Sequence, residues 1–190
     1  MKQLLPSALS FTHSLIKEVV QVGDTVVDAT VGNGHDTLLL AECVGETGHV
    51  IGFDIQKIAI ETTQDKLNEA KLAHRVSLYH KGHEEINTVL SSSTDLSVVV
   101  YNLGYLPKGD KNIITTPKTT LKSIEQALNH LKSKGMVLLM IYYGHEGGET
   151  EKDAVLDYVK QLPQNEFSVL QYQFINQTNS PPFLIAIEKR

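Results

Sequence analysis

Two glycines and two carboxylates in the first third of the chain have the spacing of a nucleotide-type cofactor site. Asp28 ends a short apolar run and is followed closely by Gly32 and Gly34. Glycines of this kind let the backbone turn sharply into a helix, whose first N–H groups then face the ligand. Asp54 comes about 20 residues after the second glycine, where an acid binds ribose hydroxyls. The pattern predicts a pocket for a ligand that carries a ribose.

The same segment favours one class of cofactor over another. A dinucleotide fingerprint requires a third glycine three residues after the second, and Thr37 occupies that position. Asp28 places a carboxylate at the end of a buried strand, where a charge is costly unless it has a partner. The ammonium group of S-adenosylmethionine is such a partner. We therefore expect S-adenosylmethionine rather than NAD, with S-adenosylhomocysteine as product.

Several residues beside these four are expected to complete the cofactor pocket. They are Thr30, Asn33, Asp36, Ile55, Gln56 and His83, together with Asn102 and Leu103. Asn33 could equally cap the helix that follows it. Asp36 could simply interact with the dipole of the same helix. His83 begins the helix after the third predicted strand, so it either lines the adenine pocket or caps that helix.

A second group of residues follows the fourth predicted strand. Residues 102–107 read Asn-Leu-Gly-Tyr-Leu-Pro and resemble the Asn-Pro-Pro-Tyr loop of amino-methyltransferases. Methyl transfer needs a neutral amine aimed at the methyl carbon. The Asn102 oxygen and the Leu103 carbonyl can accept N–H bonds from that amine, and Tyr105 can stack on a base. The alternative is a turn asparagine and a core tyrosine. Gly104 in place of a proline leaves more room, so the substrate need not be a flat purine.

A third group follows the fifth predicted strand. Residues 142–148 read Tyr-Tyr-Gly-His-Glu-Gly-Gly, and this loop should lie over the same crevice. His145 is the best candidate for a general base because an imidazole titrates near neutral pH, and Tyr142 is the second candidate. The alternative is a glycine-rich loop with an incidental histidine. The histidines show no ligand spacing with cysteines, so we expect no metal site.

The elements that must position these groups alternate along the chain. Helices are predicted over residues 7–20, 35–43, 56–70, 83–90, 119–132 and 149–161, with Gly135 as the stop of the fifth. Strands are predicted over residues 25–29, 49–54, 76–80, 96–101, 136–143, 167–174 and 183–188. Alternation implies an α/β fold with a mostly parallel seven-stranded sheet and helices on both faces, which resembles the Rossmann-like topology of class I methyltransferases. The last two strands form an antiparallel hairpin at one edge.

Composition limits the classes of protein that this chain can belong to. Its 190 residues, 41% of them hydrophobic, fit one domain over residues 1–190. The net charge of −5 argues against a broad nucleic-acid-binding face but leaves room for a local patch at Lys108, Lys111, Lys118 and Lys122. A single cysteine, Cys43, fits a reducing cytoplasm. No signal peptide or membrane-length apolar run is present, so we expect a soluble, cytoplasmic protein without a membrane partner.

Three motifs, in the order in which the family carries them, resemble those of a small bacterial family long labelled as rRNA methylases. They are residues 28–37 (Asp-Ala-Thr-Val-Gly-Asn-Gly-His-Asp-Thr), residues 102–107 and residues 144–148 (Gly-His-Glu-Gly-Gly). The resemblance covers nearly the whole chain. The family is similar to the MnmM-type tRNA methyltransferases. It implies conversion of 5-aminomethyl-2-thiouridine to its methylaminomethyl form at the wobble position of tRNA.

The resemblance also implies partners and roles for the residues. The substrate amine is protonated near neutral pH and must lose a proton, which gives His145 or Tyr142 a role. Splaying out a base from a single-stranded loop costs little. Lys108, Lys111 and Lys118 would hold phosphates of the anticodon stem-loop, although the family pattern has glycine where Lys108 stands. A homodimer is compatible with the resemblance. The alternatives are a methyltransferase of rRNA or of a small-molecule amine, and a binding module or dinucleotide enzyme.

Overall fold

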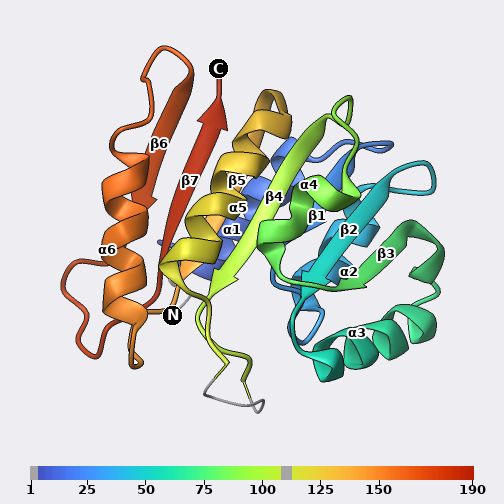
Figure 1. Cartoon of the computed structure of the whole chain (residues 1–190), viewed down its shortest axis with the longest axis horizontal. Coiled ribbons are helices and arrows are strands. Elements are labelled where there is room, and N and C mark those ends of the chain that lie inside the picture. The colour runs from blue at the N-terminus through green and yellow to red at the C-terminus, as the bar shows by residue number, and fades with distance from the viewer. Residues whose placement is uncertain (1–3, 108–112) are drawn as a thin grey trace.

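The computed structural model describes residues 4–107 and 113–190 and contains a seven-stranded sheet in the order β3-β2-β1-β4-β5-β7-β6 (Figure 1). The strands are β1 (Thr25–Asp28), β2 (His49–Asp54), β3 (Val76–His80), β4 (Leu96–Leu103), β5 (Leu131–Ile141), β6 (Phe167–Tyr172) and β7 (Phe183–Lys189). Neighbours from β3 to β5 pair in parallel, whereas β7 pairs antiparallel with both β5 and β6. The predicted Rossmann-like fold, with its antiparallel edge hairpin, is confirmed.

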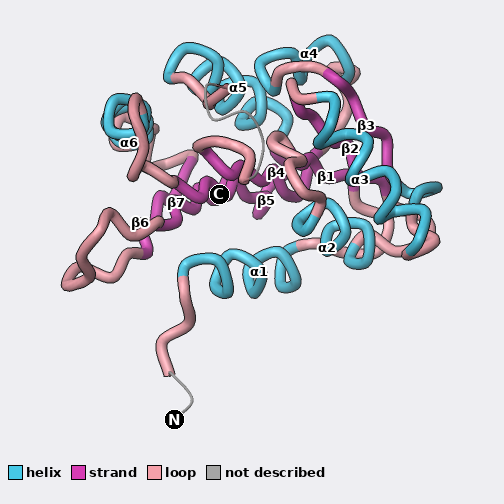
Figure 2. Tube along the Cα trace, turned by 90° about the horizontal axis from the view of Figure 1, so that it is seen from below, coloured by secondary structure: helices cyan, strands magenta, loops and turns pink. Residues whose placement is uncertain are grey.

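Helices cover both faces of the sheet (Figure 2). One layer contains α1 (Ala8–Val19), α2 (His35–Cys43) and α3 (Lys57–Glu69), and the other contains α4 (Ile86–Val89), α5 (Pro117–His130) and α6 (Gly148–Val159). Short 3₁₀ turns lie at Ala73–Arg75 and His83–Glu85, so the predicted helix over 83–90 is a 3₁₀ turn followed by α4. Within the described ranges, no helix is both long and apolar enough to cross a bilayer.

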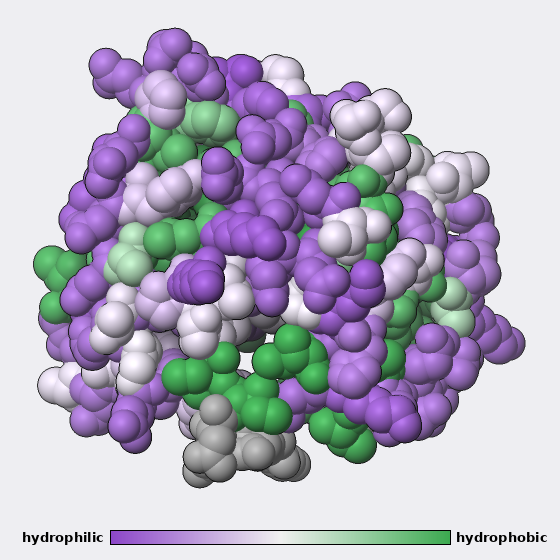
Figure 3. Space-filling view, in the orientation of Figure 1, coloured by the Kyte–Doolittle hydropathy of each residue, from purple (hydrophilic) through white to green (hydrophobic). Residues whose placement is uncertain are grey.

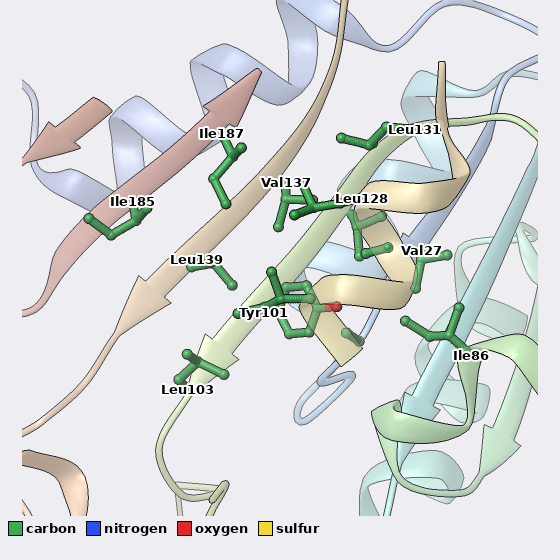
Figure 4. Packing of buried hydrophobic residues seen from close by; sticks show 14 of the residues in the cluster. Val27, Ile86, Tyr101, Leu103, Leu128, Leu131, Val137, Leu139, Ile185 and Ile187 are labelled. Atoms are coloured by element: carbon green, nitrogen blue, oxygen red, sulfur yellow. The ribbon is translucent and has the colours of Figure 1, made fainter. Parts of the chain in front are cut away.

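The sheet separates two apolar cores because successive side chains of a strand point to opposite faces. In β5, Leu139 packs in the core between the sheet and α4, α5 and α6, whereas Met140 packs in the core between the sheet and α1, α2 and α3. Figure 4 shows the first core, with Tyr101 of β4 among aliphatic side chains. The Tyr101 hydroxyl is hydrogen-bonded to Ser123 Oγ at 2.8 Å, so its burial leaves no unpaired polar atom.

The junction between α5 and β5 differs from its prediction. α5 ends at His130, and Gly135 lies inside β5 rather than stopping a helix. Leu131 already pairs with Leu96, and the pairing register shifts between Leu96 and Val98. A Cβ on Gly135 would lie 2.9 Å from the Leu96 carbonyl oxygen. The glycine therefore permits a close approach of two strands at a bulge.

The first helix lies along the centre of the sheet although it precedes every strand in the sequence. α1 begins at the Ser7 cap, whose hydroxyl accepts the Ser10 N–H at 3.1 Å, and it buries Ile16 in the core against the sheet. The Tyr172 hydroxyl of β6 donates to the Pro6 carbonyl at 2.8 Å. The start of the chain is thereby fixed against strands from its end.

Candidate active site

The carboxyl ends of β1, β2 and β4 border a cavity of about 280 Å³. This is the switch point of the strand order, where open α/β sheets bind ligands. Figure 3 shows a hollow at this edge with apolar side chains around it. Of the residues predicted from the sequence, the cavity wall contains Thr30, Gly32, Asp54, Ile55, Gln56, His83, Asn102, Gly104 and Tyr105. The wall does not include Asp28, Asn33, Gly34, Asp36, Leu103, Tyr142 or His145.

Asp54 joins the glycine turn to the end of β2. Its Oδ2 accepts the Gly32 N–H and its Oδ1 accepts the Gln56 N–H, both at 2.8 Å. Burial raises the pKa of the Asp54 carboxyl, while the two backbone donors oppose that rise. Each carboxylate oxygen keeps lone-pair capacity for a further donor, such as a ribose hydroxyl in the cavity.

Gly34 is the N-cap of α2 and has a left-handed φ of +78°. A Cβ there would lie 2.6 Å from Thr63 Oγ1 of α3, so glycine allows the two helices to approach. Asn33 does not cap the helix, contrary to one of its predicted roles. Its carbonyl instead accepts a hydrogen bond from Lys66 Nζ at 2.6 Å.

Asp28 is fully buried at the end of β1 rather than exposed on the cavity wall. It accepts hydrogen bonds from the Thr37 hydroxyl at 2.6 Å and the Thr30 N–H at 3.2 Å. Burial, together with the nearby charge of Asp36, raises the pKa of Asp28 to about 7. The carboxylate predicted to meet an ammonium group directly therefore lies behind the wall, and its nearest partners are a hydroxyl and an amide.

Asn102 belongs to β4 and not to the loop after it, which corrects both its predicted place and the reading as a turn residue. Its backbone N–H donates to Thr30 Oγ1 at 2.7 Å, and its Nδ2 donates to Asp36 Oδ2 at 2.7 Å. An ionised carboxylate only accepts hydrogen bonds, so the amide nitrogen must be the end that faces Asp36. The amide oxygen is then free to face the cavity.

His13 of α1 completes this chain of contacts. Its Nε2 lies 2.8 Å from Asp36 Oδ1, and Asp36 is 7% exposed. Asp36 therefore contacts the side chains of His13 and Asn102 in addition to any interaction with the helix dipole. His13 could not be predicted from the sequence because it lies 23 residues before Asp36 on another helix, and no motif spacing connects the two.

The residues after Asn102 also differ in part from their prediction. Leu103 is buried in the core and does not line the cavity, and its carbonyl accepts the Tyr142 N–H at 3.0 Å. Gly104 has a φ of +152°, and a Cβ there would lie 3.2 Å from Tyr142 Cβ. Tyr105 is 41% exposed and therefore is not a core aromatic.

Tyr142 and His145 lie beside Gly104, just outside the cavity wall. Burial raises the pKa of the Tyr142 phenol and the charge of Asp36 adds to the rise, so the phenol is a hydrogen-bond donor at neutral pH. The His145 ring packs edge-on against Tyr105, with centroids 5.5 Å apart. Its Nε2 is buried without a hydrogen-bond partner among the described residues.

Glu151 anchors the loop that borders the cavity, and no sequence pattern indicated it. The Thr115 and Thr120 hydroxyls each donate to its carboxylate, which is 2% exposed at the start of α6. The Gly104 N–H in turn donates to Thr115 Oγ1 at 2.9 Å. The base of the loop after β4 is thus fixed to α6. On sequence alone, a glutamate in the first turn of a helix is typical of an exposed position.

His83 lines the cavity and is buried. Burial lowers the pKa of its imidazole, so the ring is neutral at neutral pH. Its Nε2 has no hydrogen-bond partner among the described residues. The ring packs edge-on against Tyr101 with centroids 5.8 Å apart. A neutral, unpaired ring nitrogen at this wall can exchange a hydrogen bond with a heterocyclic base.

The predicted basic patch is described only in part. Lys108 and Lys111 lie outside the described residues. Lys118 and Lys122 are exposed on α5, near Thr119 on the cavity wall. In residues 4–107 and 113–190, no group of three or more His, Cys, Asp or Glu side chains could hold a metal ion.

Comparison with known proteins identifies the family. The model of a family described as "Putative rRNA methylase" matches residues 50–188. A protein of Arabidopsis thaliana named tRNA (mnm(5)s(2)U34)-methyltransferase, chloroplastic, is 35% identical over 96% of this chain and 69% of its own length.

Two crystal structures have the same fold over their whole length. One, described as a "putative rRNA-methylase" from Clostridium thermocellum, is 44% identical and has a TM-score of 0.96, covering 99% of this chain and 100% of that one. The other, described as a "putative methyltransferase" from Streptococcus mutans in complex with S-adenosylhomocysteine, is 37% identical and has a TM-score of 0.90, covering 98% and 100%. The chain therefore belongs to the methyltransferase family described as "Putative rRNA methylase".

Proposed function

We propose that this chain is an S-adenosylmethionine-dependent N-methyltransferase that acts at the tRNA wobble position. It converts 5-aminomethyl-(2-thio)uridine to 5-methylaminomethyl-(2-thio)uridine. The observation that carries the proposal is the Asn102 amide at the end of β4, whose nitrogen is bound by Asp36 and whose oxygen is left for the cavity. The Arabidopsis relative, which aligns with nearly the whole chain, is named for the same modified nucleoside.

The cofactor occupies the cavity at the ends of β1, β2 and β4. Asp54 accepts the ribose hydroxyls, His83 borders the adenine, and the turn from Thr30 to Gly34 faces the methionine portion. Asp36 supplies negative charge behind that portion, and the cofactor's ammonium and sulfonium groups would in turn favour the ionised form of Asp28. The Streptococcus mutans relative was crystallised with the demethylated product of this cofactor.

The substrate amine approaches between Asn102 and Tyr142. The substrate ammonium must first lose a proton, for which His145 is the acceptor. With the cofactor bound, the neutral amine would then form an N–C bond to the methyl carbon while the C–S bond breaks with its electron pair remaining on sulfur, and the methylated nitrogen would release its extra proton to solvent. The Asn102 oxygen accepts an N–H bond and so aims the nitrogen lone pair at the methyl group. Tyr105 offers an exposed ring on which the uracil can stack. His145 borders this ring and Gly104 leaves room for the aminomethyl arm.

The anticodon stem-loop extends over the loop after β4 and the start of α5, and Lys108, Lys111 and Lys118 contact its phosphates. We further propose that the protein acts as one domain over residues 1–190 and as a homodimer, which light scattering can test. A reducing cytoplasm suits its single cysteine, whereas the Arabidopsis relative is named chloroplastic.

The direct test is methylation of purified tRNA that carries the unmethylated aminomethyl group. We expect the methylaminomethyl nucleoside to accumulate, detected by nucleoside mass spectrometry with a labelled methyl donor. tRNA without the aminomethyl group should remain unlabelled, and so should ribosomal RNA. Labelling of ribosomal RNA with no labelling of the aminomethylated tRNA would replace this proposal with an rRNA methyltransferase.

A further inference from the structure

Asn102 can present either of two chemically opposite groups to the substrate. Its oxygen would accept an N–H from the amine and leave the nitrogen lone pair free to attack. Its NH₂ group would instead donate to that lone pair and block the attack. The shape of the side chain does not determine which orientation is adopted, because the two ends of an amide have nearly the same shape. The orientation must be determined by the group that hydrogen-bonds to the other end of the amide.

Asp36 is the group that lies behind the amide. Its Oδ2 accepts the Asn102 Nδ2–H at 2.7 Å. The pair is part-buried, and Asp36 is 7% exposed, so water competes little for this contact. Hydrogen bonds to an ionised acceptor are stronger than neutral ones. Turning the amide over would bring its oxygen against a carboxylate, which has no proton to offer.

His13 holds the other oxygen of the same carboxylate. Its Nε2 lies 2.8 Å from Asp36 Oδ1, which places the donating N–H of the ring on Nε2. The His13 ring comes from α1, so the carboxylate is held from one side by that helix and from the other by β4. The carboxylate cannot rotate without losing one of the two contacts.

From this arrangement we infer that Asp36 and His13 are positioning residues that turn the Asn102 amide oxygen toward the substrate amine. This inference rests on the proposed function and adds to it the pair of contacts that makes Asn102 a hydrogen-bond acceptor for the substrate amine. Neither residue needs to touch the substrate. The arrangement favours nucleophiles that carry N–H groups, since these have a proton to donate to the Asn102 oxygen.

An exchange of the two side chains tests the inference. In Asp36→Asn, the carboxylate becomes an amide that no longer dictates which end of Asn102 faces the cavity. In Asn102→Asp, two carboxylates face each other. The double variant Asp36→Asn/Asn102→Asp restores one amide donor against one carboxylate acceptor, and an oxygen again faces the cavity.

We expect each single variant to lower single-turnover methylation by about a hundredfold, and the double variant to recover about tenfold or more of that loss. All rates are measured at saturating S-adenosylmethionine, because removal of the Asp36 charge is expected to weaken cofactor binding, and calorimetry gives the affinity of each variant. Circular dichroism serves as the control for folding. If the fold-loss of the double variant equals the product of the fold-losses of the two single variants, the inference is overturned.

His13 is tested by a rescue with a second donor. His13→Ala should lower turnover at saturating tRNA with little change in KM, whereas His13→Gln keeps an N–H donor and should retain most of the activity. The matched control is His74→Ala, because His74 contacts Glu46 at 3.0 Å in an exposed histidine–carboxylate pair away from the cavity. Equal activities of His13→Ala and His74→Ala would contradict the role of His13. Absence of turnover by the wild-type protein would instead count against the proposed function.

Discussion

At the scale of single residues, Asn102 is the polar side chain that links the cavity to the charges behind it. Its backbone N–H contacts Thr30, its amide nitrogen contacts Asp36, and the residue lines the cavity. One residue thus connects β1, α2 and β4 at the point where the proposed reaction takes place.

Asn102→Ala should separate chemistry from cofactor binding. Removing the amide should lower kcat by about a hundredfold to a thousandfold, because the amine loses the acceptor that aims it. The affinity for S-adenosylmethionine should change by less than about threefold. Single-turnover kinetics and calorimetry measure the two quantities. Equal losses in both would mean that Asn102 has a structural role instead.

Asp28 makes stability depend on pH in a way that can be assigned to one group. Its pKa is raised from an ordinary value of 3.8 to about 7 in the folded chain. The folded state therefore prefers the protonated carboxyl, and the stability that this preference contributes is lost as pH rises from about 4 through about 7. Asp28→Asn keeps an acceptor for Thr37 but carries no charge.

The difference in unfolding free energy between Asp28→Asn and wild type should therefore grow in favour of the variant by about 1 kcal/mol per pH unit in this window. Urea denaturation at pH 4.5, 5.5 and 6.5 measures it. A pH-independent difference would show that Asp28 ionises freely. Above pH 7 the difference should level off, which serves as an internal control.

At the scale of elements, the glycine turn between β1 and α2 has to satisfy both a backbone conformation and a close contact. Gly34→Ala introduces a left-handed alanine and also a Cβ 2.6 Å from Thr63 Oγ1. We expect a loss of about 2–4 kcal/mol in unfolding free energy. The affinity for S-adenosylmethionine should fall by about tenfold as the turn shifts.

Gly23→Ala is the matched control for this turn. Gly23 also has a positive φ, of +95°, but a Cβ there would lie at an ordinary 3.4 Å from Thr47 Oγ1 and far from the cavity wall. Gly23→Ala should lower the unfolding free energy by about 1–2 kcal/mol and leave the affinity for S-adenosylmethionine unchanged. If the two variants behaved alike in both measurements, the contact between α2 and α3 would have no part in shaping the site.

Elements with a clear apolar pattern of their own were predictable, and element ends or side-chain contacts set by particular distant partners were not. The bounds of β2 and β3 agree with the apolar runs that predicted them. The start of β5 was missed because its polar beginning at Lys132–Lys134 looks like a helix end, whereas pairing of Leu131 with Leu96 decides the structure. His13 and Glu151 were missed for the same reason. Each meets its partners only after helices far apart in sequence pack together.

At the scale of the whole molecule, the distribution of charge governs how an acidic chain can approach RNA. The net charge is −5, so attraction for phosphates must be local. Lys118 and Lys122 lie one turn apart on α5 and are exposed, close in sequence to Thr119 on the cavity wall. We expect them to contact the anticodon stem.

Lys118→Ala/Lys122→Ala should weaken tRNA binding by about tenfold at low salt and reduce the slope of log K against log salt by about 1–2. Filter binding across a salt series measures both. Lys160→Ala, at the far end of α6, removes one positive charge elsewhere, against two in the double variant, and should change neither by much. An equal effect of Lys160 would indicate a non-specific contribution of net charge.

The placement of β7 between β5 and β6 has a consequence for how the protein is made. β7 follows β6 in sequence yet is an interior strand, and it also supports the first helix through Leu184 and Ala186. Until it arrives, the nascent chain has an unpaired apolar edge at β5, and α1 lacks part of the surface it packs on. Because α1 carries His13, we expect the contact between His13 and Asp36 to form late in folding, after β7 has joined the sheet.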